Sequence, residues 1–229
     1  MSSERVEILE TRLEPGGVGC VLALPPGLRP SAGQYLLGFS AEAGDLLPAA
    51  LFPAELPAPE MAFAAPLPSG WGAGMRLALR GPLGHGFHLP AGPRRVALAA
   101  LNDSAGPLLP LAQAALAAGG EVALYARAAP PGLPAQVEVL PLDLLPEAPG
   151  WAHYLALDAP LRLLPGLPRL LGLERPGNLG CPAEVLARAD MPCGGLAACG
   201  VCAVEARKGW KLACKDGPVF DWEELKFNG

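Results

Sequence analysis

The stretch Cys193-Gly-Gly-Leu-Ala-Ala-Cys199-Gly-Val-Cys202, followed by Cys214, is the most informative part of this 229-residue chain. Its cysteines follow the spacing C-x5-C-x2-C-x11-C, and the residues between the first three are nearly all small. Iron–sulfur clusters are held by four thiolates, and a tight loop of small residues leaves backbone N–H groups free to bond to the sulfurs. The spacing therefore predicts a [2Fe–2S] cluster on Cys193, Cys199, Cys202 and Cys214.

Other uses of the cysteines are weighed against this prediction. A zinc site usually pairs two C-x2-C knuckles, whereas only Cys199 and Cys202 form one here. A zinc-stabilised interaction module without redox activity stays open as an alternative. Cys181, 12 residues before Cys193, stays open as a substitute cluster ligand, and Cys20 is predicted to be a buried strand thiol.

The overall composition excludes several classes of partner. The net charge is −5, and the scattered Lys and Arg residues form no basic face for nucleic acid. No stretch approaches the roughly 18 apolar residues that a membrane-spanning helix requires. The N-terminal residues Met-Ser-Ser-Glu-Arg do not resemble a secretion signal, so we expect a cytoplasmic protein without nucleic-acid or membrane partners. Disulfides are rare in that compartment, which favours metal binding by the cysteines.

Upstream of the cysteines the sequence pattern changes near residue 93. Residues 4–90 read as short strands separated by Pro-Gly and Ala-Gly turns, which favours a small antiparallel barrel. From residue 95 onward, a buried strand, an apolar helix over 107–118 and a second strand predict a βαβ unit. Two further strands, near residues 137 and 153, extend the same parallel sheet, and residues 161–180 read as a connector.

The chain is therefore predicted to be of the α/β plus β class, with three parts. An N-terminal antiparallel β-barrel occupies residues 1–92, and a central βαβ parallel-sheet domain occupies residues 93–175. A small C-terminal iron–sulfur segment occupies residues 176–229.

Two motifs resemble a known family. Leu212-Ala-Cys-Lys-Asp-Gly-Pro-Val-Phe220 resembles the closing motif of the electron-transfer subunit of bacterial dihydroorotate dehydrogenase. Gly81-Pro-Leu-Gly-His-Gly-Phe87 is similar to the turn that ends the flavin-binding barrel in that family, part of the ferredoxin–NADP reductase superfamily. The resemblance implies an electron-transfer subunit rather than a stand-alone enzyme. It implies that electrons pass from NADH to FAD, and then through the cluster to the flavin of a dihydroorotate dehydrogenase catalytic subunit in pyrimidine biosynthesis.

Both dinucleotide sites depart from the family pattern. Residues 45–54 contain no Arg, Ser or Thr where the family places an arginine against the flavin pyrophosphate. Residues 99–106 lack the family's glycine-rich turn, and Asp103 stands where the phosphates of a nicotinamide dinucleotide are expected. We therefore expect no NAD binding, and FAD binding stays open. A cluster-only relay or docking subunit is the alternative function.

The C-terminal segment also supplies candidates for contact with the partner. Trp210 is expected to serve in packing rather than in electron transfer. Apolar residues of the segment are candidates for contact with the catalytic subunit, and the alternative for each is packing on the chain's own domains: Leu196, Val201, Val219, Phe220 and Trp222.

Overall fold

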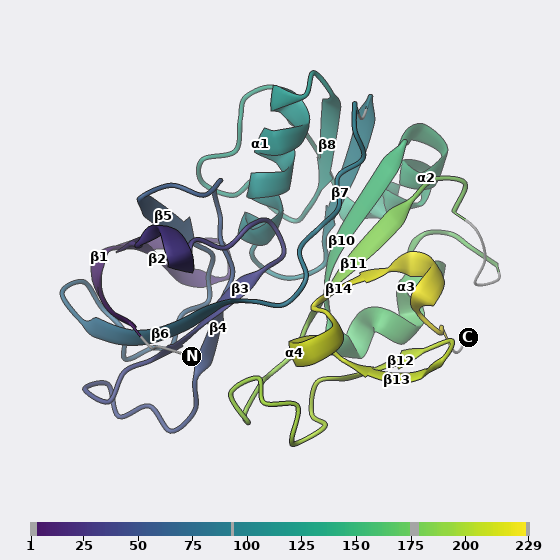
Figure 1. The fold of residues 1–229 in the computed structure, drawn as a ribbon. Helices are drawn as coiled ribbons and strands as arrows, with labels where there is room; N and C mark the ends of the chain where they lie inside the picture. The colour runs from purple at the N-terminus through teal and green to yellow at the C-terminus, as the bar shows by residue number, and fades with distance from the viewer. Residues whose placement is uncertain (1–3, 93, 175–178, 228–229) are drawn as a thin grey trace.

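The computed structural model describes residues 4–92, 94–174 and 179–227. Figure 1 shows an N-terminal sheet in purple to blue, a second sheet in teal and green, and a C-terminal segment in yellow. No helix within the described residues is long and apolar enough to cross a membrane.

The N-terminal part is a six-stranded antiparallel sheet in the order β4-β3-β6-β1-β2-β5. Along β1 buried and exposed side chains alternate at Val6 and Ile8, which is the pattern of a sheet with one solvated face. The buried faces close around a core of its own that includes Ile8, Met61 and Phe63. The predicted antiparallel architecture is confirmed. Its strands are β1 (Glu4–Glu14), β2 (Gly17–Ala23), β3 (Tyr35–Phe39), β4 (Ala49–Leu51), β5 (Glu60–Phe63) and β6 (Arg76–Leu83).

The second sheet also has six strands, in the order β14-β11-β10-β7-β8-β9. Neighbouring strands are parallel, except that β14 runs antiparallel to β11 at the edge. The predicted βαβ unit and its extension are confirmed. The strands are β7 (Arg95–Ala100), β8 (Glu121–Tyr125), β9 (Glu138–Leu140), β10 (Tyr154–Pro160), β11 (Ala183–Arg188) and β14 (Val219–Asp221).

Helices cover both faces of this second sheet. The 3-10 turn η2 (Gly106–Leu108) leads into α1 (Leu109–Ala117), which buries Leu111 and Ala115 against one face. The stretch 161–170 forms short helices where a connector was expected; Pro168 lies in the first turn of α3, where proline is tolerated, and Pro165 lies inside the 3-10 helix η4. The elements on the opposite face are η3 (Leu142–Glu147), α2 (Ala148–Trp151), η4 (Leu161–Gly166) and α3 (Leu167–Leu170).

The C-terminal segment is joined to the second sheet by its strands. Both β11 and β14 come from beyond residue 175, so part of the predicted iron–sulfur segment completes the parallel-sheet domain. The domain limits at residues 92 and 175 remain a proposal. Between these strands lie β12 (Ala203–Ala206), β13 (Gly209–Leu212) and α4 (Ala213–Asp216), and η5 (Trp222–Glu224) follows β14.

For three of the five contact candidates the alternative of packing within the chain is confirmed, whereas the expectation for Trp210 is wrong. Val219, Phe220 and Trp222 are not surface residues, because β14 pairs with β11 and places them in the chain's own core. Trp210 does not pack in a core: it is 71% exposed, because the two-stranded sheet of β12 and β13 has one solvated face. Leu196 and Val201 are exposed, as a docking surface requires.

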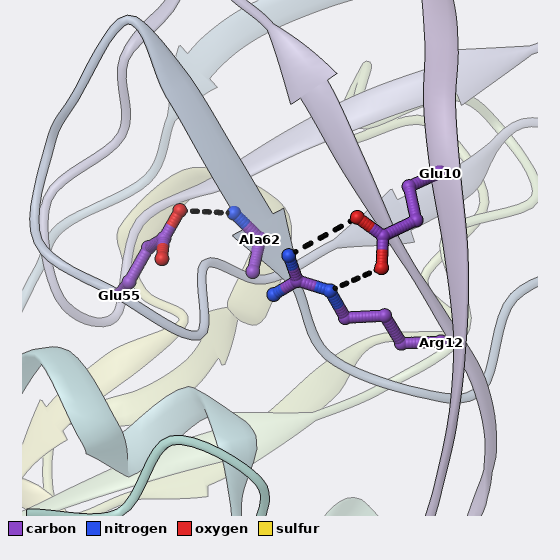
Figure 2. A network of polar contacts seen from close by, with 4 residues as sticks. All are labelled: Glu10, Arg12, Glu55 and Ala62. Carbon is purple, nitrogen blue, oxygen red and sulfur yellow. Dashed lines mark hydrogen bonds and ion pairs between the residues drawn. The ribbon is translucent and has the colours of Figure 1, made fainter.

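The edge of the barrel next to α1 carries several polar contacts. Arg12 donates from Nε to Glu10 Oε1 at 3.0 Å, and the Glu55 carboxylate accepts the Ala62 N–H at 2.5 Å (Figure 2). Close by, the Leu56 N–H donates to the Gln113 side chain of α1 at 3.1 Å. Charges at this edge of the barrel are thus satisfied within the chain, and the Arg12 guanidinium lowers the pKa of Glu10.

The two motifs that suggested the family touch each other. The His85 N–H, in the turn after β6, donates to the Gly217 carbonyl oxygen at 2.7 Å. A Cβ added at Gly84 would lie 2.3 Å from Cδ of Pro218 and 2.8 Å from the Gly217 oxygen, and Gly84 has a φ of +76°. Glycine at this position therefore allows the C-terminal segment to lie directly on the barrel.

We expect Gly84→Ala to destabilise the protein more than Gly92→Ala. Both residues have positive φ, a conformation that costs an alanine about 1–2 kcal/mol, but a Cβ at Gly92 meets nothing within 4 Å. The extra overlap at Gly84 should cost about 1–3 kcal/mol more. At about 2–4 °C per kcal/mol for a chain of this size, the two melting temperatures should be clearly separated. Equal melting temperatures would contradict the packing described above.

Candidate metal centre

The four predicted cluster ligands lie in two neighbouring elements. Cys193, Cys199 and Cys202 belong to the loop between β11 and β12, and Cys214 lies in the short helix α4 after β13. The hairpin of β12 and β13 brings them together, since the Ala213 N–H donates to the Cys202 carbonyl oxygen at 2.9 Å. Their exposure differs: Cys199 is exposed, Cys193 is partly buried, and Cys202 and Cys214 are buried.

The thiols meet as two pairs. Cys199 lies close enough to Cys193 to lower its pKa, and Cys202 lies close enough to Cys214 to raise its pKa. Cys193 also lies close enough to Cys214 for their charges to interact. In a two-iron cluster each iron takes two protein ligands, so a pair of cysteine pairs matches the donor set of that cofactor.

The loop backbone is shaped to stabilise negative charge. Gly194, Gly195, Ala197 and Gly200 have φ between 58° and 72°, and Ala197 is the one non-glycine residue with positive φ among the residues described. Successive N–H groups in such turns point into a common concavity and form an anion-binding nest. This loop geometry therefore fits a cofactor whose sulfurs carry negative charge.

Two of the thiols have pKa values shifted in opposite directions, one by the loop backbone and the other by burial. Hydrogen bonds from the backbone N–H of Ala198, then from the Cys199 side chain and the N–H groups of Leu196 and Cys199, lower the pKa of Cys193 to about 6. Cys193 is therefore largely a thiolate at neutral pH, the form that binds metal. Burial, followed by the hydrogen bond with Cys202, raises the pKa of Cys214 to about 11.

The barrel forms the inner wall of the site. Tyr35 of β3 donates its hydroxyl to the Cys214 carbonyl oxygen at 3.4 Å. Burial, and next to it the charge of the Cys214 thiolate, raises the pKa of this tyrosine. Arg80 of β6 donates from Nη2 to the Gly194 carbonyl oxygen. Neither contact was evident from the sequence, because these residues precede the loop by more than 110 positions.

The other two cysteines lie elsewhere. Cys20 is a buried thiol on β2, as predicted, and burial raises its pKa to about 12. Cys181 precedes the first residue of β11, whereas the cluster loop follows its last residue. A six-residue strand spans roughly 20 Å, so Cys181 and Cys193 lie at opposite ends of β11.

The geometry of the thiols differs from that of a single-ion site. Within residues 4–92, 94–174 and 179–227, no three His, Cys, Asp or Glu side chains converge closely enough to hold one metal ion. The histidines have other contacts: His88 Nδ1 lies 2.8 Å from the Glu184 carboxylate, which also accepts the Tyr154 hydroxyl at 2.5 Å.

A cleft of about 1110 Å³ lies beside the cluster loop, between the barrel and the second sheet. Every barrel residue that lines it is apolar, and the polar lining residues come from the opposite side: Asn102, Arg162, Arg188 and Asp190. Asp45, which precedes the lining residue Leu47 by two positions, accepts the Trp71 indole N–H at 2.8 Å. A flavin pyrophosphate needs cationic or hydroxyl donors, so the side chains on the barrel side of this cleft do not fit one.

The turn after β7 is also unsuited to a dinucleotide. A Cβ at Gly106 would lie 2.6 Å from the Ala64 Cβ, and a Cβ at Gly16 would lie 3.0 Å from the Ser104 nitrogen. Barrel residues thus pack directly on the turn that leads to α1, where phosphates would have to approach the helix. Asp103 is exposed and pairs with Arg127 at 3.0 Å.

The end of β10 carries a buried carboxyl group. Asp158 is fully buried, accepts the Asn102 amide N–H at 2.8 Å and lies 3.5 Å from Arg188 Nη1. Burial raises the pKa of Asp158 to about 6, against the lowering effect of Arg188. The Arg188 guanidinium also stacks on the Phe52 ring, 4.5 Å from its centroid. These residues connect the second sheet to Phe52, which directly follows β4 of the barrel, and Asn102 and Arg188 also line the cleft.

Comparison with known families bears directly on the cysteine loop. Residues 189–226 match the model of the iron–sulfur cluster binding domain of dihydroorotate dehydrogenase B. The C-terminal segment is an iron–sulfur cluster binding domain of this type. This domain contains all four cysteines, and it confirms the iron–sulfur cofactor and the resemblance predicted from the two motifs. A search of curated proteins found no match.

Solved structures show the fold of the whole chain. An NADH-dependent reduced ferredoxin–NADP oxidoreductase is 18% identical and aligns over 99% of this chain and 91% of its own, with a TM-score of 0.75. Phthalate dioxygenase reductase is 13% identical over 93% of this chain and 78% of its own, with a TM-score of 0.56. A ferredoxin NADP+ reductase from Neisseria gonorrhoeae is 14% identical over 82% and 98%, also with a TM-score of 0.56. The iron–sulfur domain thus sits on a ferredoxin–NADP reductase fold, and the chain is an electron-transfer protein.

Serine substitution of any of the four cysteines should remove the cluster. We expect Cys193→Ser, Cys199→Ser, Cys202→Ser and Cys214→Ser to lose the visible absorbance and the EPR signal of the reduced protein, because each thiolate is one of four ligands. Cys20→Ser and Cys181→Ser are the controls and should keep full iron and acid-labile sulfide. Full iron and sulfide in Cys193→Ser would show that another residue, with Cys181 the first to test, supplies the ligand.

Proposed function

We propose that this chain is the electron-transfer subunit of a flavin-containing dihydroorotate dehydrogenase of cytoplasmic pyrimidine biosynthesis. It would relay electrons to or from the partner's flavin through a [2Fe–2S] cluster on Cys193, Cys199, Cys202 and Cys214. The observation that carries the proposal is the meeting of these four cysteines as two pairs inside a domain of the matching family. The bound cluster would supply one-electron chemistry, whereas dihydroorotate releases electrons in twos and needs a flavin to divide them.

The chain's own residues support this role in three ways. The left-handed loop directs N–H groups at the sulfurs and so stabilises their negative charge. Cys202 and Cys214 are buried, which shields that half of the site from water. Cys199 is exposed, which leaves one edge of the site open to a partner. Electron tunnelling weakens steeply with distance, so this edge is the one that an acceptor has to approach.

The open edge is bordered by apolar side chains. Leu196 is 68% exposed and Val201 is 50% exposed, and both flank Cys199 in the loop. Across the cleft that Val201 lines, Leu47 of the barrel is also exposed. We call Leu47, Leu196 and Val201 the docking patch. An apolar patch around an exposed ligand favours contact with another protein, since exposed clusters of this kind are usual at interfaces.

A second candidate is a relay that uses the cluster alone. It is favoured by the packing of the barrel on the turn at Gly106 and by the wholly apolar barrel side of the cleft, which offers no side-chain partner to a flavin pyrophosphate. On this proposal the reductase fold serves as the scaffold for the cluster loop, and a protein other than this chain receives the hydride of NADH.

We expect the docking patch to control binding of the catalytic subunit. The double change Leu196→Ser and Val201→Ser should weaken Kd by about tenfold or more, because two apolar side chains would lose burial at the interface. Leu13→Ser is the control, since Leu13 is 86% exposed on β1 of the barrel, far along the chain from the loop. The measurement is titration calorimetry with a dihydroorotate dehydrogenase catalytic subunit. An unchanged Kd for the double variant, with a weakened one for Leu13→Ser, would place the interface on the barrel.

We also expect the isolated, iron-loaded chain not to oxidise NADH. The packing of Ala64 on the turn before α1 leaves no path for the phosphates, and Asp103 adds a negative charge nearby. Stopped-flow absorbance should show no bleaching of the cluster by NADH, whereas dithionite, the control, reduces it. Rapid bleaching by NADH would overturn the cluster-only candidate and restore a complete reductase.

A further inference from the structure

Arg80 extends from the barrel to the cluster loop. It lies within β6, directly before the Gly81–Phe87 motif, and its Nη2 donates to the carbonyl oxygen of Gly194, the residue after Cys193. A Cβ added at Gly195 would lie 3.2 Å from the same Nη2 and 3.4 Å from the Tyr35 hydroxyl. The guanidinium is therefore in direct contact with the loop that carries three of the four cysteines.

The charge of this arginine has no carboxylate partner. In the part of the chain that the structure describes, no Asp or Glu lies within 4.0 Å of Arg80, whereas Arg12, Arg127 and Arg188 each have one. Its Nε is buried and has no hydrogen-bond acceptor among the described residues. A buried N–H without an acceptor costs free energy. The hydrogen bonds of Arg80 within the described residues therefore do not account for its position, and we look for its role in the loop that it contacts.

The group that an unpaired cation would act on here is the cluster. Two ferric ions, two sulfides and four thiolates sum to a charge of −2, and one added electron makes it −3. A nearby positive charge stabilises the reduced form more than the oxidised form, and charge and hydrogen bonding at the sulfurs are among the factors that set cluster potentials. The barrel screens Arg80 partly from water, which strengthens its interaction with the loop.

We propose that Arg80 raises the reduction potential of the cluster and so makes the barrel a tuning element for electron transfer. Arg80 is a positioning residue, because it acts through the ligand loop and does not bind the iron. The inference rests on the proposed function only in requiring that the four cysteines hold a [2Fe–2S] cluster. It gives the barrel a role in this chain that does not depend on either dinucleotide.

The test compares midpoint potentials of isolated, iron-loaded variants, measured by EPR-monitored redox titration. Arg80→Gln and Arg80→Met remove the charge, and Arg80→Lys keeps it. Arg76→Gln is the matched control, because Arg76 is an exposed arginine at the other end of the same strand. We expect each neutral variant to lower the equilibrium constant for one-electron reduction by about tenfold, which corresponds to 59 mV. Arg80→Lys and Arg76→Gln should stay near the unchanged protein.

Two results would overturn the inference. The first concerns the neutral variants, Arg80→Gln and Arg80→Met, that retain full iron and sulfide. If such a variant has the same midpoint potential as Arg76→Gln, the charge of Arg80 has no effect on the cluster. The other is a fall in Arg80→Lys as large as in the neutral variants, since the charge would then not be the cause. Failure of the unchanged protein to hold iron and sulfide is a separate result, which would overturn the proposed function instead.

Discussion

The contact between the turn after β6 and the Gly217-Pro218 peptide is the constraint on which the site depends. The hydrogen bond from the His85 N–H to the Gly217 oxygen joins two residues that are more than 130 positions apart, and it lies between Cys214 on one side and β14 on the other. Because Gly84 has no side chain, the segment lies on the barrel at van der Waals distance. This contact fixes where the last cysteine stands relative to the barrel residues Tyr35 and Arg80.

One continuous core carries this constraint through the molecule. Tyr35 and Phe52 of the barrel, Leu157 of the second sheet, and Cys202 and Phe220 of the terminal segment belong to the same set of buried residues. The cysteine loop is therefore not an independent module attached by a linker, because the barrel and the neighbouring strands β11 and β14 share its core. A site that must hold four thiolates in fixed directions gains from such support, since the loop itself contains few side chains able to pack.

The sequence predicted the parts of this arrangement that are local. The four cysteines, the antiparallel barrel and the βαβ unit follow from spacing and periodicity, which short windows of sequence contain. The burial of Val219, Phe220 and Trp222 could not be read in the same way, because it results from the pairing of β14 with β11 across about 30 residues. The contact of Arg80 with Gly194 left no sequence signal at all, since an arginine before a Gly-Pro turn is compatible with many environments.

The barrel and the second sheet are also joined by direct contacts away from the cysteine loop. At the turn before α1, the space where phosphates would approach is occupied by Ala64 and Gly16, so the barrel and the second sheet pack there directly. At the end of β10, Asp158 accepts a hydrogen bond from Asn102 and pairs with Arg188. The Arg188 guanidinium also stacks on the Phe52 ring, and this contact joins the second sheet to the barrel a second time. Both sets of contacts join the barrel to the second sheet, and these same two parts also contact the cysteine loop. A chain that serves its cluster would keep these contacts whether or not a dinucleotide binds, because the loop relies on the relative position of barrel and sheet rather than on their pockets.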